Sequence, residues 1–166
     1  AESCPQYFYL SEEDLKTKGP WVVSQPPLRA KAELAKMWEC LGNGYVDMIG
    51  SDHASYQEKE KEEGYRDIWK VFYDYTGMPG VETLLPLMYD AVSNGRISLG
   101  RLVQVTSLNP SKIYGLYPKK GVLHLGSDAD LVVFDPKRRT NIAGANLHSK
   151  CKWTPYEARA VEGWPE

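Results

Sequence analysis

A helical pattern, a glycine turn and a short apolar segment follow one another in the first third of this 166-residue chain. Apolar residues recur at helical spacing over residues 28–41, and the Gly-Asn-Gly at 42–44 predicts where this helix stops. Residues 45–50 are apolar enough for a buried strand, and Ser, Asp and His follow directly. This order is typical of an α/β fold, in which the carboxyl ends of parallel strands carry the chemistry. We therefore expect an α/β protein with Asp52 and His53 near its functional site.

Turn signals and apolar periodicity divide the rest of the chain into further elements. In chain order, we expect a short helix after the Ser11 capping box, a brief strand at 21–23, a solvated loop at 57–67, a strand or a covering loop at 68–75, a tight turn at 77–80, a helix at 81–94, a helix from Ser98 to about 107, a short helix opened by Asn109-Pro110, and strands at 122–125 and 131–134. The pattern becomes β-rich after Leu116, which places a boundary near residue 118.

Composition and charge exclude several classes of protein. The formal net charge is -2 and no stretch concentrates positive charge, so a nucleic-acid partner is not expected. No run of about 18 apolar residues is present, and therefore we expect no membrane partner. The three cysteines are widely spaced and odd in number, which argues against a disulfide framework and favours a cytoplasmic location.

Asp52 is the best candidate for chemistry on position alone. A carboxylate at a strand end can ligate a metal or take a proton from bound water, although such an Asp often only caps the next turn. His124 and His148 form no HxH or HxxxH pair, so surface or core packing is the simpler account of both. The cysteines have no Cys-x-x-Cys spacing or adjacent histidine, which favours a structural role.

Several segments taken together resemble one known family. They are 2–7 (Glu-Ser-Cys-Pro-Gln-Tyr), 26–29 (Pro-Pro-Leu-Arg), 49–54 (Ile-Gly-Ser-Asp-His-Ala), 77–82 (Gly-Met-Pro-Gly-Val-Glu), 109–112 (Asn-Pro-Ser-Lys) and 120–135, which contains Gly-Ser-Asp-Ala-Asp-Leu-Val-Val-Phe-Asp. Their order and spacing are similar to those of the cyclic amidohydrolases, the group of hydantoinase, dihydropyrimidinase, allantoinase and dihydroorotase. The resemblance covers almost the whole chain.

The resemblance implies a fold and a site. The fold is α/β: the last strands and helices of a TIM-like (β/α)8 barrel in residues 1–118, and part of a small β domain in 119–166. In the family, the Asp that matches Asp52 is both a metal ligand and the catalytic proton carrier. Main-chain groups at the turn matched by Pro79 and Gly80 recognise the ring, and the position of Gln25 contacts substrate. The implied cofactor is a divalent metal, zinc by preference, the substrate is a small cyclic amide, and the full-length form is a homo-oligomer.

Departures from the family pattern limit what this chain can do alone. The family's HxH pair, its metal-bridging lysine and two further histidines have no match here, and about two barrel strands are too few for a barrel. We therefore expect a carboxyl-terminal portion with both ends cut, which neither hydrolyses substrate nor fully binds metal by itself. Ser55 stands where Pro is common and Gln25 where Ser or Asn is usual. Gln6 resembles hydantoinases, whereas the Trp-Thr-Pro-Tyr-Glu at 153–157 resembles allantoinases, so the ring substrate stays open.

The sequence leaves two functions open. The first is metal-dependent hydrolysis of a cyclic amide, with this chain supplying the strand-end Asp52. The second is a catalytically inactive relative, or a fragment, that serves binding or assembly, because a fold can outlast its site. An acid kept at a strand end favours the enzyme.

Overall fold

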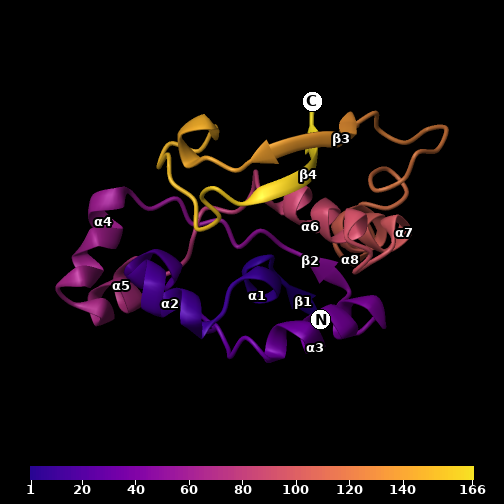
Figure 1. Cartoon of the computed structure of the whole chain (residues 1–166). Coiled ribbons are helices and arrows are strands. Elements are labelled where there is room, and N and C mark those ends of the chain that lie inside the picture. Colours follow the sequence, from indigo (N-terminus) through magenta and orange to yellow (C-terminus); the bar gives the residue numbers. More distant parts are fainter.

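The computed structural model describes all residues from Ala1 to Glu166. Two small sheets lie among the helices, a parallel one near the middle of the molecule and an antiparallel one at its edge (Figure 1). The strands are β1 (Glu2–Ser3), β2 (Met48–Ile49), β3 (Phe134–Asn141) and β4 (Ala160–Pro165). The α-helices are α1 (Gln6–Tyr9), α2 (Glu12–Lys18), α3 (Glu33–Gly42), α4 (Glu58–Glu62), α5 (Ile68–Asp74), α6 (Leu84–Ser93), α7 (Leu99–Val103) and α8 (Asn109–Ile113). Short 3-10 helices are η1 (Gly19–Val22), η2 (Glu63–Tyr65) and η4 (Gly144–Asn146), and η3 (Gln104–Leu108) is a π-helix.

The parallel sheet joins segments that lie far apart in the sequence. β1 pairs with β2 in parallel, with Glu2 opposite Met48 and Ser3 opposite Ile49. A single parallel bridge between His53 and Met78 extends the same arrangement. The strand predicted at 45–50 is therefore present as β2, although it is only two residues long. Because the strands are parallel, the residues that follow them gather at one edge.

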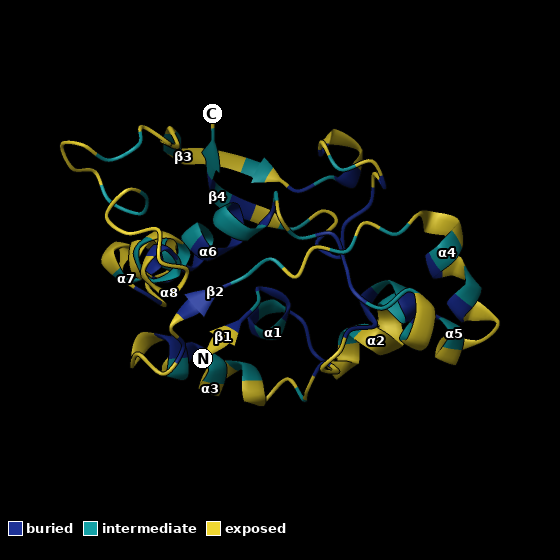
Figure 2. Cartoon of the chain, turned by 180° about the vertical axis from the view of Figure 1, so that it is seen from behind, coloured by how far each residue is buried: buried dark blue, intermediate teal, exposed yellow.

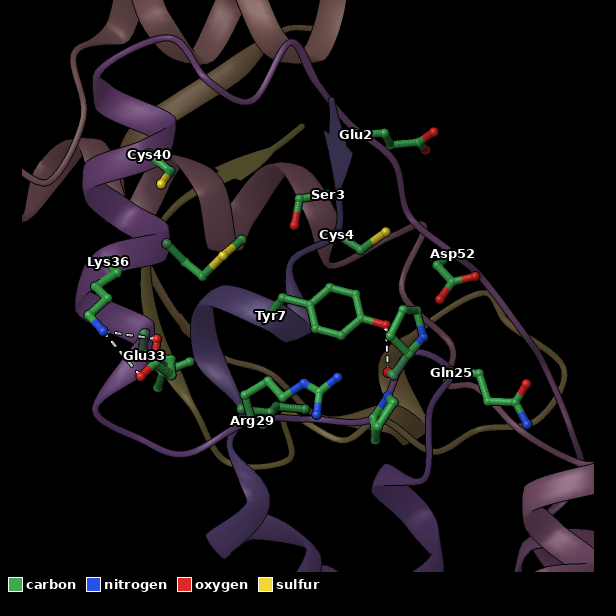
Figure 3. A pocket seen from close by; sticks show the side chains of 15 residues that line it. Glu2, Ser3, Cys4, Tyr7, Gln25, Arg29, Glu33, Lys36, Cys40 and Asp52 are labelled. Carbon is green, nitrogen blue, oxygen red and sulfur yellow. Dashed lines mark hydrogen bonds and ion pairs between the residues drawn. The ribbon is translucent and has the colours of Figure 1, made fainter.

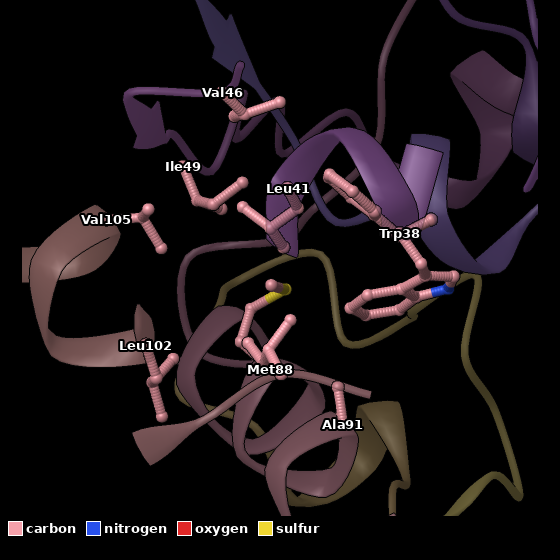
Figure 4. Close-up of a cluster of buried hydrophobic side chains, with 10 residues drawn as sticks. Trp38, Leu41, Val46, Ile49, Met88, Ala91, Leu102 and Val105 are labelled. Atoms are coloured by element: carbon pink, nitrogen blue, oxygen red, sulfur yellow. The ribbon is translucent and has the colours of Figure 1, made fainter. Parts of the chain in front are cut away.

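One hydrophobic cluster packs β2 against the surrounding helices (Figure 4). Trp38 and Leu41 of α3 meet Ile49 of β2 and Met88 of α6 in this cluster. The helix predicted over 28–41 thus exists, but it begins only at Glu33; the Arg29 carbonyl before it accepts a hydrogen bond from the Glu12 N–H at 2.9 Å and not from a following turn of helix. As Figure 2 shows, β2 is buried in the middle of the chain.

Several other predicted elements agree with the structure. Ser11 and Asp14 form the capping box of α2, and Ser98 caps α7 by accepting a hydrogen bond from the Arg101 backbone at 3.1 Å. The helix expected at 81–94 is α6. The pieces expected from Ser98 to about 107 and at Asn109-Pro110 are α7, η3 and α8 in direct succession, so Asn109 lies inside a helical run and does not begin one.

Several predicted elements are wrong. Residues 21–23 end a 3-10 helix, because Pro20 lies at its start and presets a helical φ. Residues 57–67 are α4 and η2, and residues 68–75 contain α5, since Gln57 and Asp67 each cap a helix start. The predicted strands at 122–125 and 131–134 are absent apart from Phe134, where pairing with Pro165 ends and leaves the preceding residues without a ladder partner.

A second hydrophobic cluster brings the two parts of the chain together. Val22, Met78 and Leu87 pack in it with Ile142 and Trp153. The antiparallel pair β3 and β4 lies over α6 (Figure 1). The division of the chain into 1–118 and 119–166 stays a prediction. None of the helices combines the length and the apolar character that a membrane crossing requires.

Lys61 of α4 is fully buried, although its sequence surroundings are a charged run. Its Nζ donates hydrogen bonds to the carbonyl oxygens of Tyr75 and Gly77, both at 3.0 Å. No carboxylate forms an ion pair with it, and the Trp153 ring centroid lies 5.8 Å from Nζ. Burial lowers the pKa of the Lys61 ammonium to about 8. The segment predicted to be a solvated loop therefore contributes a core residue.

The lowered pKa predicts a pH dependence of stability. The unfolded chain holds the Lys61 proton up to the ordinary pKa of 10.5, whereas the folded chain releases it from about 8. The unfolded state binds more protons in this window, so the free energy of unfolding should rise with pH there, by an amount on the order of 3 kcal/mol. Urea unfolding from about pH 7 to about pH 11, compared with Lys61→Met, isolates this contribution. A difference between the two proteins that stays constant with pH would contradict the prediction.

Candidate active site

The residues that follow β1 and β2 meet at the carboxyl edge of the parallel sheet. Cys4 comes directly after β1, and Asp52 lies three residues after β2. Asp52 has a φ of +47°, in the left-handed region that residues other than glycine rarely adopt. Backbone conformations of this kind are concentrated at functional sites, where the surrounding structure holds them. The strand end predicted from the sequence therefore carries an unusual backbone at the expected residue.

Gln6 holds the carboxylate of Asp52. It lies at the start of α1, is only 5% exposed, and its Nε2 donates to Asp52 Oδ2 at 2.9 Å. Asp52 itself is exposed, so its other oxygen is free to meet a ligand. The two residues are 46 positions apart, and the pairing of β1 with β2 is what brings them together. Sequence reasoning missed this role of Gln6, for which the only signal is a polar residue among the buried neighbours Pro5 and Phe8.

Asp52 lines a cavity with a volume of about 790 Å³. Figure 3 shows Cys4, Tyr7 and Asp52 beside this cavity, with Glu33 and Lys36 of α3 across from Asp52. Arg29 and Gln25 complete the polar part of the lining. The cavity is therefore bounded by the sheet edge, by α3 and by the segment before α3, and is large enough for a small cyclic ligand.

Protonation of the neighbouring groups excludes one kind of chemistry. Burial, with the carboxylates of Asp52 and Glu2 nearby, raises the pKa of the Cys4 thiol to about 12. Cys4 is thus a neutral thiol near pH 7 and not a thiolate nucleophile. Burial also raises the pKa of the Tyr7 hydroxyl, which donates to the Pro26 carbonyl at 2.9 Å. Neither of these two neutral groups is a base near pH 7, and the carboxylates that line the cavity are those of Glu2, Glu33 and Asp52.

The predicted substrate-binding residues lie in two places. Gln25 lines the cavity together with Asp52, and its Nε2 donates to the Phe72 carbonyl at 2.8 Å, which leaves its Oε1 available. Pro79 and Gly80 do not line this cavity. They are nevertheless close to the strand end, because a Cβ on Gly80 would lie 2.8 Å from the Ser51 carbonyl oxygen. The backbone here approaches as closely as only glycine permits.

His53 connects the strand end to residues 77–80, called the 77–80 segment below. The tight turn predicted at 77–80 is wrong, because Met78 forms a parallel bridge with His53 and the turn follows only at residues 81–83. The Nδ1 of His53 accepts hydrogen bonds from the backbone N–H groups of Gly80 at 3.1 Å and Val81 at 3.3 Å. The Ala54 N–H also donates to the Met78 carbonyl at 2.9 Å. His53 therefore accepts hydrogen bonds from the backbone at the end of the 77–80 segment.

The side chains of this chain do not by themselves form a metal site. No group of three or more His, Cys, Asp or Glu side chains is arranged to hold a metal ion. A catalytic zinc commonly has three protein ligands, and Asp52 supplies one carboxylate. His124 and His148 lie away from Asp52: His148 Nδ1 contacts Glu82 Oε1 at 2.8 Å, and His124 is exposed in the 119–133 segment.

Comparison with known proteins now gives the class. The amidohydrolase family model matches residues 14–157, so the chain belongs to the amidohydrolase family. It is 39% identical to an L-hydantoinase of Paenarthrobacter aurescens over 99% of this chain, and 40% identical to a dihydroorotase of Halobacterium salinarum over 94% of it. A solved structure of a D-hydantoinase superimposes with a TM-score of 0.95 at 36% identity, over 100% of this chain and 36% of that one.

The comparisons confirm the family and the fold class predicted from the sequence motifs. The chain has an α/β fold and matches a portion of barrel amidohydrolases. It spans about 35% of the length of the two relatives named above. The activity of a whole protein that contains this chain is therefore a proposal.

Proposed function

We propose that this chain supplies the Asp-bearing strand end of a hydrolase that opens a cyclic amide of the hydantoin, dihydropyrimidine or allantoin type. The observation that carries the proposal is the placement of Asp52, which lines a cavity at a strand end with one oxygen held by the buried Gln6. Membership of the amidohydrolase family and the similarity to hydantoinases and a dihydroorotase support it.

In this proposal Asp52 moves one proton. The carboxylate takes a proton from a water molecule as the water oxygen attacks the ring carbonyl carbon. Asp52 then hands that proton to the ring nitrogen as the C–N bond breaks, so the carboxylate is regenerated and the open product carries a new carboxyl group. The hydrogen bond from Gln6 to Oδ2 fixes the side chain, and the other oxygen performs both transfers.

Backbone groups of the 77–80 segment orient the ring in the same proposal. Gly80 uses its N–H for His53 and its carbonyl for Thr83 and Leu84. The Met78 carbonyl is taken by Ala54, whereas the Pro79 carbonyl accepts no hydrogen bond within the chain. We therefore assign to the Pro79 carbonyl the role of accepting a ring N–H, with Gly80 permitting the close approach. Gln25 Oε1 is a second acceptor at the cavity.

A divalent metal, zinc by preference, belongs to the proposal at the level of the whole protein. Asp52 would be one ligand, and the remaining ligands would come from residues outside 1–166, because the side chains of this chain do not complete a site. We also propose, for the whole protein, a homo-oligomeric state and a cytoplasmic location.

A substrate panel tests the proposal. The full-length protein that contains this chain is incubated with a 5-substituted hydantoin, dihydrouracil, allantoin and dihydroorotate, and the open product is separated and quantified. We expect at least one ring to open at a kcat of about 1 s⁻¹ or more, an ordinary enzymatic value. Failure to open any of the four rings, by a folded and metal-supplied protein, would favour the binding or assembly relative.

A further inference from the structure

The buried Lys61 is a feature that neither the cavity nor the proton transfer uses. Its side chain is 0% exposed, and it bonds to backbone carbonyls and to no carboxylate. Burying an amine in this way is costly unless its hydrogen bonds are satisfied. A neutral amine has two N–H groups, which suffice for the two carbonyls that it contacts. The two carbonyls therefore satisfy the neutral amine, whereas the ammonium form has a third N–H with only the Trp153 ring, at 5.8 Å, beside it.

The two carbonyls bonded by Lys61 belong to the start of the 77–80 segment and to the residues before it. Tyr75 follows α5 as its C-cap, and Gly77 begins the segment with a φ of +108°. The Gly77 N–H donates to the Val23 carbonyl at 2.9 Å, so both sides of this peptide segment are fixed. A Cβ on Gly77 would lie 2.7 Å from the Ala54 Cβ, which leaves no room for a shift toward the strand end. Lys61 thus anchors the start of the 77–80 segment.

His53, which is next to Asp52 in the sequence, anchors the end of the same segment. Between the two anchors lie Met78 and Pro79, both buried. The position of the free Pro79 carbonyl relative to the Asp52 carboxylate therefore depends on both anchors. The Trp153 ring lies over Lys61, and Trp153 Nε1 donates to the Tyr56 carbonyl at 2.7 Å, which joins the 119–166 part to the same anchor.

We propose that Lys61 is a positioning residue that fixes the 77–80 segment against the Asp52 strand end and so sets the affinity for the ring. The link to ring affinity rests on the proposed function, whereas the anchoring of the segment does not. Asp52 and its Gln6 partner do not contact Lys61, so the chemical step should be affected less than binding.

The test replaces Lys61 by methionine, which fills similar space without a hydrogen-bond donor, in the full-length protein. We expect KM for the ring to rise at least about 10-fold while kcat changes less than about 3-fold, the pattern of lost binding. For Lys61→Gln, which keeps an N–H donor, we expect a KM between those of the wild type and Lys61→Met. This variant also tests the proposal if Lys61→Met does not fold.

Two controls separate positioning from general destabilisation. Lys59→Met removes an exposed charge from the same helix, and Val71→Ala removes buried volume from α5 without removing a hydrogen bond. Both should leave KM within about 2-fold of the wild type. A KM that is unchanged in Lys61→Met, or raised equally in Val71→Ala, would overturn the proposal.

Amide hydrogen exchange provides a readout that does not need activity. In Lys61→Met the amides of Ala54, Gly77 and Gly80 should exchange at least about 10-fold faster than in the wild type, because the 77–80 segment opens locally. If these amides exchange in Lys61→Met at the same rate as in the wild type, the anchoring role is overturned. If the wild type opens no ring but the exchange result holds, the proposed function fails and the anchoring role stands.

Discussion

Asp52→Asn is expected to lower the kcat for ring opening by about 10³-fold or more in the full-length protein, because general acid–base transfer contributes about 10²–10⁴-fold and one residue here performs both transfers. The amide is similar in size to the carboxylate, so the fold and the cavity should persist. The measurement is the initial rate of product formation at saturating substrate, together with the thermal unfolding midpoint as a check of folding.

Asp74→Asn is the matched control for this variant. Asp74 is an exposed carboxylate on α5 whose Oδ2 lies 3.1 Å from Lys70 Nζ, and exposed ion pairs of this kind contribute little to stability. We expect its kcat to equal that of the wild type. Undiminished turnover in Asp52→Asn would remove Asp52 from the mechanism.

Gln6→Leu is expected to lower kcat by about 10–100-fold, the usual cost of losing a partner that orients a catalytic ligand. Leucine has nearly the same volume and is tolerated at a buried position, but it cannot donate to Asp52 Oδ2. The carboxylate then samples several rotamers, while ring binding by the 77–80 segment is unchanged. Steady-state kinetics should show the loss in kcat with KM changed little.

Gln104→Leu provides the comparison for Gln6→Leu. Gln104 is exposed, and its Oε1 accepts a hydrogen bond from Arg101 at 3.3 Å, on the surface of the molecule. Its kinetics should match those of the wild type. A Gln6→Leu protein that is folded and fully active would show that the hydrogen bond to Asp52 has no catalytic role.

The strand end could be predicted from the sequence because its signals are local. The glycine turn, the apolar segment and the polar residues that follow lie within about a dozen consecutive positions, and each has a direct physical cause. The caps at Ser11 and Ser98 are local in the same sense. The placement of Asp52 at the carboxyl end of β2 agrees with the α/β expectation, and its role remains a prediction.

The partners of the site could not be predicted, since they come from distant segments. Gln6 and Asp52 are 46 positions apart, and only the parallel register of β1 and β2 brings them into contact. Lys61 stands in a charged run, where period and composition indicate solvent. Its burial results from packing against residues 75–77 and Trp153, which no local pattern encodes.

A crystal structure of the full-length protein with a bound cyclic amide or its open product tests the central claim most directly. The account predicts an Asp52 oxygen at about 2.6–3.2 Å from the cleaved nitrogen or the attacking water, which is the reach of a general base. It also predicts a ring N–H that donates to the Pro79 carbonyl. A ring bound away from the carboxyl end of β2, with Asp52 out of hydrogen-bond reach, would contradict the account.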